Sequence, residues 1–150
     1  MTHSFKLALG ADHGGVALKA RLASALIAAG HNVLDYGTND TASVDYPDYA
    51  HAVCAAVEEK QADFGILVCG SGIGMSIAAN RHSDIRCALV HDVTTARLSR
   101  AHNDANVLAL GARILGEQVA LDILNAFLAT DFEGGRHEQR LAKLNQDTEA

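Results

Sequence analysis

The sequence predicts a single α/β domain in which helices cover both faces of a parallel sheet of five strands. Apolar runs alternate with amphipathic stretches along the whole chain, as in strand–helix–strand units joined by right-handed crossovers. The apolar runs at 63–70 and 85–90 are continuous, which is typical of strands buried on both faces. A chain of 150 residues, 49% of them hydrophobic, suits one domain with a sizeable core.

The first half of the chain predicts two strand–helix pairs. The elements are expected at 5–11 (strand), 16–29 (helix), 31–37 (strand) and 48–59 (helix). The first helix places apolar side chains at helical spacing and stops at Gly30, the usual residue after a helix end. The second helix has Pro47 near its first turn, where the missing amide proton costs nothing. The stretch between the second strand and this helix is polar and predicts a loop.

The second half repeats the alternation. The elements are expected at 63–70 (strand), 73–81 (helix), 85–90 (strand), 93–102 (helix), 106–112 (strand) and 117–129 (helix). A sixth, exposed helix is expected over about 136–146, fraying towards its end. The whole then reads as a three-layer, doubly wound sandwich, Rossmann-like, with the flavodoxin-like strand order 2-1-3-4-5.

Composition excludes several classes of function. The net charge is −6, aromatic residues make up 5% and no run of Lys or Arg occurs, so nucleic acid is not an expected partner. The apolar start of the chain is interrupted by Asp12 and His13, unlike a signal peptide or a membrane span, so we expect a cytoplasmic protein without a membrane partner. The three cysteines have no CxxC spacing, which argues against a disulfide framework or a zinc knuckle.

Polar side chains gather just beyond the predicted strands, where ligands bind in doubly wound sheets. These residues are Asp12, His13, Cys69, His91, Asp92 and Arg113, with His102–Asp104 before the last strand. The GSGIG loop after Cys69 is not a dinucleotide fingerprint, because Met75 stands at the sixth position, and no GK[ST] follows. Its backbone N–H groups at a helix start favour an anion or an oxyanion, although the glycines could equally serve only a tight turn.

Cys69 has two readings. A free cysteine is most often an inert core residue. At a helix N-terminus, however, the dipole and nearby amides favour the thiolate, which can act as a base or a nucleophile. Cys54 and Cys87 have no such setting and are expected in the core.

Arg136 and Arg140 are four residues apart, so on a helix they share one face. They form either a solvated basic edge or, together with Arg113, a fork-like phosphate clamp. No metal site is predicted, because the HEQRL stretch from His137 lacks the second His of a zinc-protease helix. Of the other histidines, His13 and His102 are candidates for the site. Those expected on the surface or in loops are His3, His31, His51 and His82.

Several motifs occur in an order that resembles the type B ribose-5-phosphate isomerases and their galactose- and allose-6-phosphate isomerase relatives. They are GADHGG, DYPDYA, CGSGIGMSIAANR, LSRAHNDANVLALGAR and FEGGRHEQR. The similarity extends from Lys6 to about Leu144. It implies an aldose–ketose isomerase that uses neither metal nor cofactor and acts on a sugar phosphate through an enediolate. It also implies a homodimer with the active site at the subunit interface and the 136–146 helix reaching toward the partner. Whether two dimers pair into a tetramer stays open at this point.

The resemblance assigns roles residue by residue. Cys69 would be the base that moves the proton between C1 and C2, and His102 the acid that opens the furanose ring. Some relatives use a Glu six residues after the thiol position, but Met75 stands there in this chain. Asp12 would handle hydroxyl protons. The expected substrate-binding residues are Asp12, His13, Gly70, Ser71, Gly72, Ile73, Gly74, Asn103, Arg113, Arg136 and Arg140, with the Ser71 hydroxyl also catalytic.

Two alternatives remain open at this point. The substrate could be a tetrose 4-phosphate or a hexose 6-phosphate in place of ribose 5-phosphate. The chain could instead be a non-catalytic regulatory module on the same fold. A receiver domain would need a phospho-acceptor Asp after the third strand and a Lys after the fifth, where this chain has Cys69 and Arg113.

Overall fold

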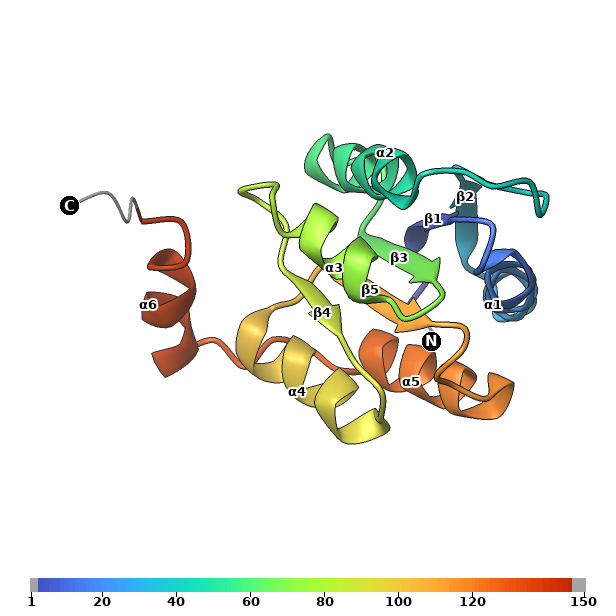
Figure 1. Cartoon of the computed structure of the whole chain (residues 1–150). Helices are drawn as coiled ribbons and strands as arrows, with labels where there is room; N and C mark the ends of the chain where they lie inside the picture. The colour runs from blue at the N-terminus through green and yellow to red at the C-terminus, as the bar shows by residue number, and fades with distance from the viewer. Residues whose placement is uncertain (1–2, 147–150) are drawn as a thin grey trace.

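The computed structural model describes residues 3–146 and contains one five-stranded parallel sheet between two layers of helices (Figure 1). The strands are β1 (Lys6–Ala11), β2 (Asn32–Asp35), β3 (Phe64–Cys69), β4 (Cys87–Leu89) and β5 (Val107–Gly111). The helices are α1 (Val16–Ala28), α2 (Tyr46–Glu58), α3 (Ile73–Ala79), α4 (Val93–Asn103), α5 (Glu117–Ala129) and α6 (Arg136–Ala142). The predicted fold class and its strand–helix alternation are confirmed.

The predicted strand order is wrong at one edge. The sheet runs β2-β1-β3-β5-β4, so β5 pairs with β3 and β4 lies at the edge, in place of the expected 2-1-3-4-5. The reason is burial. Every residue of β5 is buried, as a central strand requires, whereas the three residues of β4 are only half-buried. Both stretches are apolar in sequence, so composition alone did not separate a central strand from an edge strand.

Alternate residues of the strands feed two cores. Residues such as Leu9, Ile66 and Leu108 face α1, α4 and α5, where Phe127 is completely buried. Leu67, Cys69 and other residues of opposite parity face α2 and α3. This period of two follows from the strand geometry. It places Cys69 on the α2–α3 side of the sheet.

The C-terminal helix α6 lies away from the sheet and packs beside α4 (Figure 1). It is shorter than expected: the helix ends at Ala142 instead of continuing to 146. Beyond it, Leu144 is 61% exposed and the Asn145 side-chain amide donates a hydrogen bond to the Ser83 carbonyl. Little apolar burial is therefore available to extend the helix past Ala142. The last part of the tail that was expected to fray, residues 147–150, lies outside the described residues.

Candidate active site

Most of the predicted residues at the strand ends meet in one cavity of about 340 Å³, here called the thiol cavity. Its lining is Asp12, His13, Gly14, Tyr46, Cys69, Gly70, Ser71, Gly74, Arg113 and Ile114. They come together because β1, β3 and β5 are parallel neighbours, so the loops after them open at the same edge of the sheet. Tyr46, at the start of α2, was not predicted to line it.

The glycine loop is folded around the thiol. Cys69 is the last residue of β3 and is 5% exposed. The Gly72 backbone N–H donates to its Sγ at 3.2 Å, and the Ile73 N–H donates to the Ser71 hydroxyl at 3.2 Å. Two of the N–H groups predicted for an oxyanion are thus committed within the loop. Gly74, in the first turn of α3, still lines the cavity and has no intrahelical acceptor for its N–H.

The charged groups of the thiol cavity are held by backbone contacts. The Asp12 carboxylate accepts the Gly14 N–H at 2.9 Å. The His13 Nδ1 accepts the Val44 N–H at 3.2 Å, so a neutral His13 carries its proton on Nε2. The Arg113 side chain lies beside Gly70, and its backbone N–H donates to the Gly70 carbonyl at 2.9 Å. A carboxylate, an imidazole and a guanidinium therefore line the same cavity as Cys69.

Four other predicted residues, His102, Asn103, Arg136 and Arg140, line a separate cavity of about 280 Å³ between the end of α4 and α6, here called the α4–α6 cavity. Its lining is His102, Asn103, Arg136, His137, Arg140, Leu141 and Leu144, none of which lines the thiol cavity. Within one chain, the structure does not bring these residues together with Cys69. The predicted residues Gly72, Ile73, His91 and Asp92 line neither cavity.

His102 stands in a cluster that the sequence did not predict. Its ring stacks on that of His137 with centroids 4.4 Å apart and planes inclined by 17°. The Glu133 carboxylate lies 3.6 Å from Nε2 of His102 and 3.8 Å from Nε2 of His137. Burial, followed by the nearby His102 and Arg136, lowers the pKa of His137. The only sequence signal was the spacing of four between Glu133 and His137.

This cluster also bears on metal binding. The ligand atoms of His102, Glu133 and His137 lie within 4.8 Å of one another. Two histidines and a carboxylate are a donor set that zinc accepts. However, nitrogen lone pairs lie in the ring planes, and the stacked rings direct them side by side instead of toward one point. The cluster as folded is thus not arranged as a tetrahedral metal site.

The two remaining cysteines are Cys54 in α2 and Cys87 in β4. Burial, with the Glu58 charge as a smaller cause, raises the pKa of Cys54 to about 12. Burial also raises the pKa of Cys87. Both are therefore protonated at neutral pH. Cys54 is buried in the core as expected, whereas Cys87, expected in the core, is only half-buried because β4 is the edge strand. His51 and His82, expected on the surface, form a chain of hydrogen bonds that ends on the Glu58 carboxylate.

Comparison with known proteins decides the family. The sequence profile described as Ribose/Galactose Isomerase matches residues 7–144. The chain belongs to this family. It is 46% identical to ribose-5-phosphate isomerase B of Escherichia coli over 139 residues, covering 93% of each chain. It is 47% identical over 141 residues to a Rickettsia conorii protein named only as a sugar phosphate isomerase, covering 94% of this chain and 98% of the relative. A crystal structure of a ribose 5-phosphate isomerase from Thermotoga maritima superposes with a TM-score of 0.93 at 48% identity, covering 94% of this chain and 97% of that one.

Family membership confirms the enzyme class predicted from the sequence, an aldose–ketose isomerase of the sugar phosphate type, and sets aside the non-catalytic module. Met75, where some relatives were expected to have Glu, is completely buried among apolar side chains. No helix within residues 3–146 has the length and apolar character needed to cross a membrane.

Proposed function

We propose that this chain interconverts ribose 5-phosphate and ribulose 5-phosphate through a cis-enediolate, without a metal ion or a cofactor. The observation that carries the proposal is the thiol cavity. There a cysteine sulfur, held by an amide donor, faces the same space as Asp12, Ser71 and Arg113. The names of the E. coli and T. maritima relatives support ribose 5-phosphate as the substrate.

In this proposal Cys69 removes the proton from C2 of the open-chain aldose and returns it to C1, which gives the ketose. The developing oxyanion is stabilised by the Ser71 hydroxyl, by loop N–H groups such as that of Gly74, and by Asn103. Each well-placed donor contributes about 3–4 kcal/mol to such a transition state. Asp12 moves the hydroxyl protons between O1 and O2.

In this proposal the α4–α6 cavity supplies the acid that opens the sugar ring and two of the arginines that bind the phosphate. His102 protonates the ring oxygen and so opens the furanose. Arg136 and Arg140 bind the phosphate together with His13 and Arg113. Because the phosphate is remote from the reacting carbons, its binding energy can be used to orient C1 and C2 against the thiolate.

The two cavities act on one substrate if two copies of the chain pair. Each copy would place its His102, Asn103, Arg136 and Arg140 over the thiol cavity of the other, with α6 reaching toward the partner. The position of α6 away from the sheet supports this arrangement (Figure 1). So does the surface of α3 beside the thiol cavity, where Ile73 and Ile77 are 53% and 52% exposed one helical turn apart.

The experiment mixes two inactive variants, Cys69→Ala and His102→Ala, under conditions of subunit exchange. Random pairing makes half of the dimers mixed, and each mixed dimer contains one intact site. The mixture should regain about a quarter of wild-type activity. No recovery after exchange has been confirmed by native mass spectrometry would show that the site is not shared. Cys54→Ala is the control and should retain activity.

Substrate choice is tested with tetrose, pentose and hexose phosphates after treatment with a chelator. The highest kcat/KM is expected for ribose 5-phosphate, with no change on removal of metal. A higher value for another sugar phosphate would reassign the substrate. Loss of activity restored by added metal would contradict the metal-free mechanism.

A further inference from the structure

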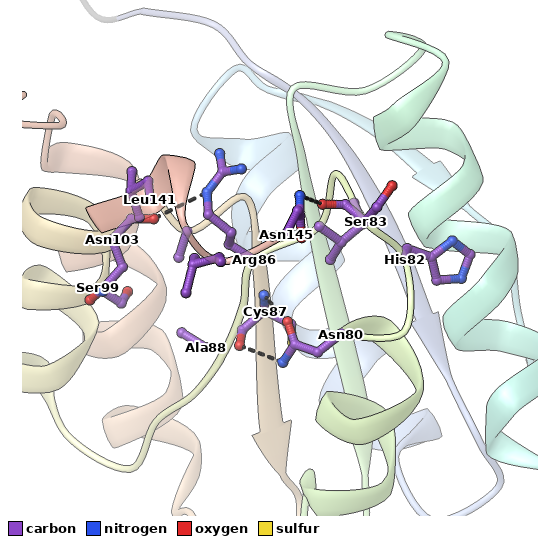
Figure 2. A pocket seen from close by; sticks show the side chains of 13 residues that line it. Asn80, His82, Ser83, Arg86, Cys87, Ala88, Ser99, Asn103, Leu141 and Asn145 are labelled. Carbon is purple, nitrogen blue, oxygen red and sulfur yellow. Dashed lines mark hydrogen bonds between the residues drawn. The ribbon is translucent and has the colours of Figure 1, made fainter. Parts of the chain in front are cut away.

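The end of α4, which carries His102 and Asn103, is tied to the start of β4 by Arg86. Arg86 directly precedes β4 and lines a third cavity of about 420 Å³ together with Ser99, Asn103 and Leu141 (Figure 2). Its Nε donates to the carbonyl oxygens of Asn103 at 3.1 Å and of Asp104 at 2.9 Å. Figure 2 shows the Arg86 side chain reaching across the cavity to Asn103. The last carbonyls of a helix have no intrahelical donor, and Arg86 supplies one to them.

Arg86 is itself anchored to the sheet. Its backbone N–H donates to the Asn106 side-chain oxygen at 2.8 Å, and its carbonyl accepts the Asn106 N–H at 3.0 Å. Asn106 immediately precedes β5 and also donates to the Asp84 carbonyl at 2.9 Å. The guanidinium therefore projects from a segment that is fixed to the central part of the sheet. It transmits that position to the end of α4.

Asp104 completes the connection. It ends α4 with φ 44° and ψ 44°, a left-handed conformation that Asp adopts more easily than most residues. Its carboxylate accepts a hydrogen bond from Nη1 of Arg100 at 2.9 Å and lies 3.4 Å from Nη2 of Arg86. Arg100 is buried, donates to the Ala105 carbonyl at 2.7 Å and stacks over the Phe64 ring at 4.8 Å. One carboxylate is thus held between two arginines, one in the core and one at β4.

The hydrogen bonds from Arg86 hold the C-terminal end of α4, where His102 and Asn103 lie. Helix ends fray unless their terminal carbonyls are bound. His102 and Asn103 are the last two residues of α4. A displacement of about 1 Å in a catalytic group can cost on the order of 100-fold in rate. Cationic side chains at this end also complement the helix dipole.

We infer that Arg86, acting through Asp104 and the Asn103 carbonyl, is a positioning residue for the ring-opening acid His102. The inference rests on the proposed role of His102. Arg86 touches no substrate in this scheme. It determines where the last turn of α4, and with it the His102 ring, stands relative to the partner's thiol cavity.

The test separates ring opening from proton transfer. Ribulose 5-phosphate cannot form a furanose, because the hydroxyl at C5 is phosphorylated. Exchange of its C1 proton with solvent deuterium needs the thiol base but no ring opening. Net conversion of ribose 5-phosphate, which is a furanose in solution, needs both. For Arg86→Gln we expect kcat for net conversion to fall about 10–100-fold and C1 exchange to fall several-fold less, because exchange loses only the contribution of Asn103, whose carbonyl Arg86 also holds, whereas conversion loses that of His102 as well. Arg97 is an exposed arginine of α4, the helix that Arg86 holds. Arg97→Gln is therefore the matched control and should change neither net conversion nor C1 exchange.

The outcomes are distinguishable. His102→Ala is measured in parallel and should show the same split between conversion and exchange. If His102→Ala shows the split and a folded Arg86→Gln variant does not, the positioning role is wrong. If His102→Ala itself lowers both rates equally, the proposed role of His102 fails first. Asp104→Asn keeps the shape and the left-handed preference but removes the charge between the arginines. If Arg86→Gln does not fold, Asp104→Asn takes its place. Asp104→Asn must then show the split between conversion and exchange for the inference to stand.

Discussion

Gly72, whose N–H binds the Cys69 sulfur, offers a quantitative test of the loop geometry. Its φ is +79°, in the left-handed region. A Cβ added there would lie 2.7 Å from a terminal carbon of Leu89, 2.9 Å from the carbonyl carbon of Leu110 and 3.1 Å from the oxygen of Leu110. The Leu89 methyl can rotate away. The Leu110 backbone belongs to the buried strand β5 and cannot.

The cost of Gly72→Ala has two parts. The left-handed conformation costs about 1–2 kcal/mol for a residue with a Cβ. The contact with the Leu110 backbone adds about 1–3 kcal/mol, as overpacking does in other cores. The sum is about 2–5 kcal/mol, a large part of the 5–15 kcal/mol by which domains are typically stable. With a slope of about 2 kcal/mol per molar, the midpoint of urea unfolding should fall by about 1–2.5 M.

Two other glycines separate these parts. Gly30, which ends α1 as the sequence predicted, has φ +91° but no atom near its Cβ position, so Gly30→Ala should lose only the conformational part, about 1–2 kcal/mol. Gly116 has φ −69° and open space but is the N-cap of α5, where Ala is less favourable than Gly, so the two effects oppose each other and Gly116→Ala should change stability by less than about 1 kcal/mol. If Gly72→Ala unfolds at the same urea concentration as Gly30→Ala, the contact with Leu110 does not matter and the steric argument is refuted. Activity should fall in Gly72→Ala alone, because only there does the amide donor to the thiol move.

Two further predictions concern single side chains. At pH 8, iodoacetamide should modify Cys69 before the other two cysteines, because the pKa of Cys54 is raised to about 12 and burial raises the pKa of Cys87. Labelling is followed by peptide mass spectrometry, and activity should be lost in step with labelling of Cys69. Equal labelling of Cys54 would contradict the assignment. Asp92 accepts the Thr95 N–H at 2.7 Å at the start of α4, and this hydrogen bond lowers its pKa. Its stabilising effect is therefore present above about pH 4, the unfolded pKa, and is lost as the pH falls through the lowered folded pKa. Asp92→Ala should lower the urea midpoint at pH 7, and the difference from wild type should shrink on acidification; a constant difference would show that the charge plays no part.

Much of the thiol cavity was predictable from the sequence, and the reason is local. An apolar run followed by polar or glycine-rich residues marks a strand end, and parallel strands bring their carboxyl ends to one edge of the sheet. Asp12, Cys69 and Arg113 follow three such runs, and they meet in one cavity. Their meeting in one cavity also depended on the strand order, because β1, β3 and β5 are neighbours in the sheet, whereas His91 and Asp92 follow the edge strand β4 and do not line this cavity.

The contacts around His102 were not predictable in this way. Glu133 and His137 belong to the segment after α5, and Arg86 belongs to the start of β4. Each reaches the end of α4 only through the packing of elements that are distant in the chain. Sequence spacing records which residues share a helix or a strand. It carries no signal for a guanidinium that crosses from an edge strand to a helix end.

The sequence by itself therefore determined the fold class, the extents of most strands and helices, the family and the residues at the strand ends. These properties follow from periodicity, turn residues and motif order, which are properties of neighbouring residues. Only the tertiary structure decided that β5 is central and β4 is the edge, that the predicted site residues divide between two cavities, and that Arg86 braces the end of α4. These depend on which surfaces can be buried together, and burial is settled by the whole chain at once.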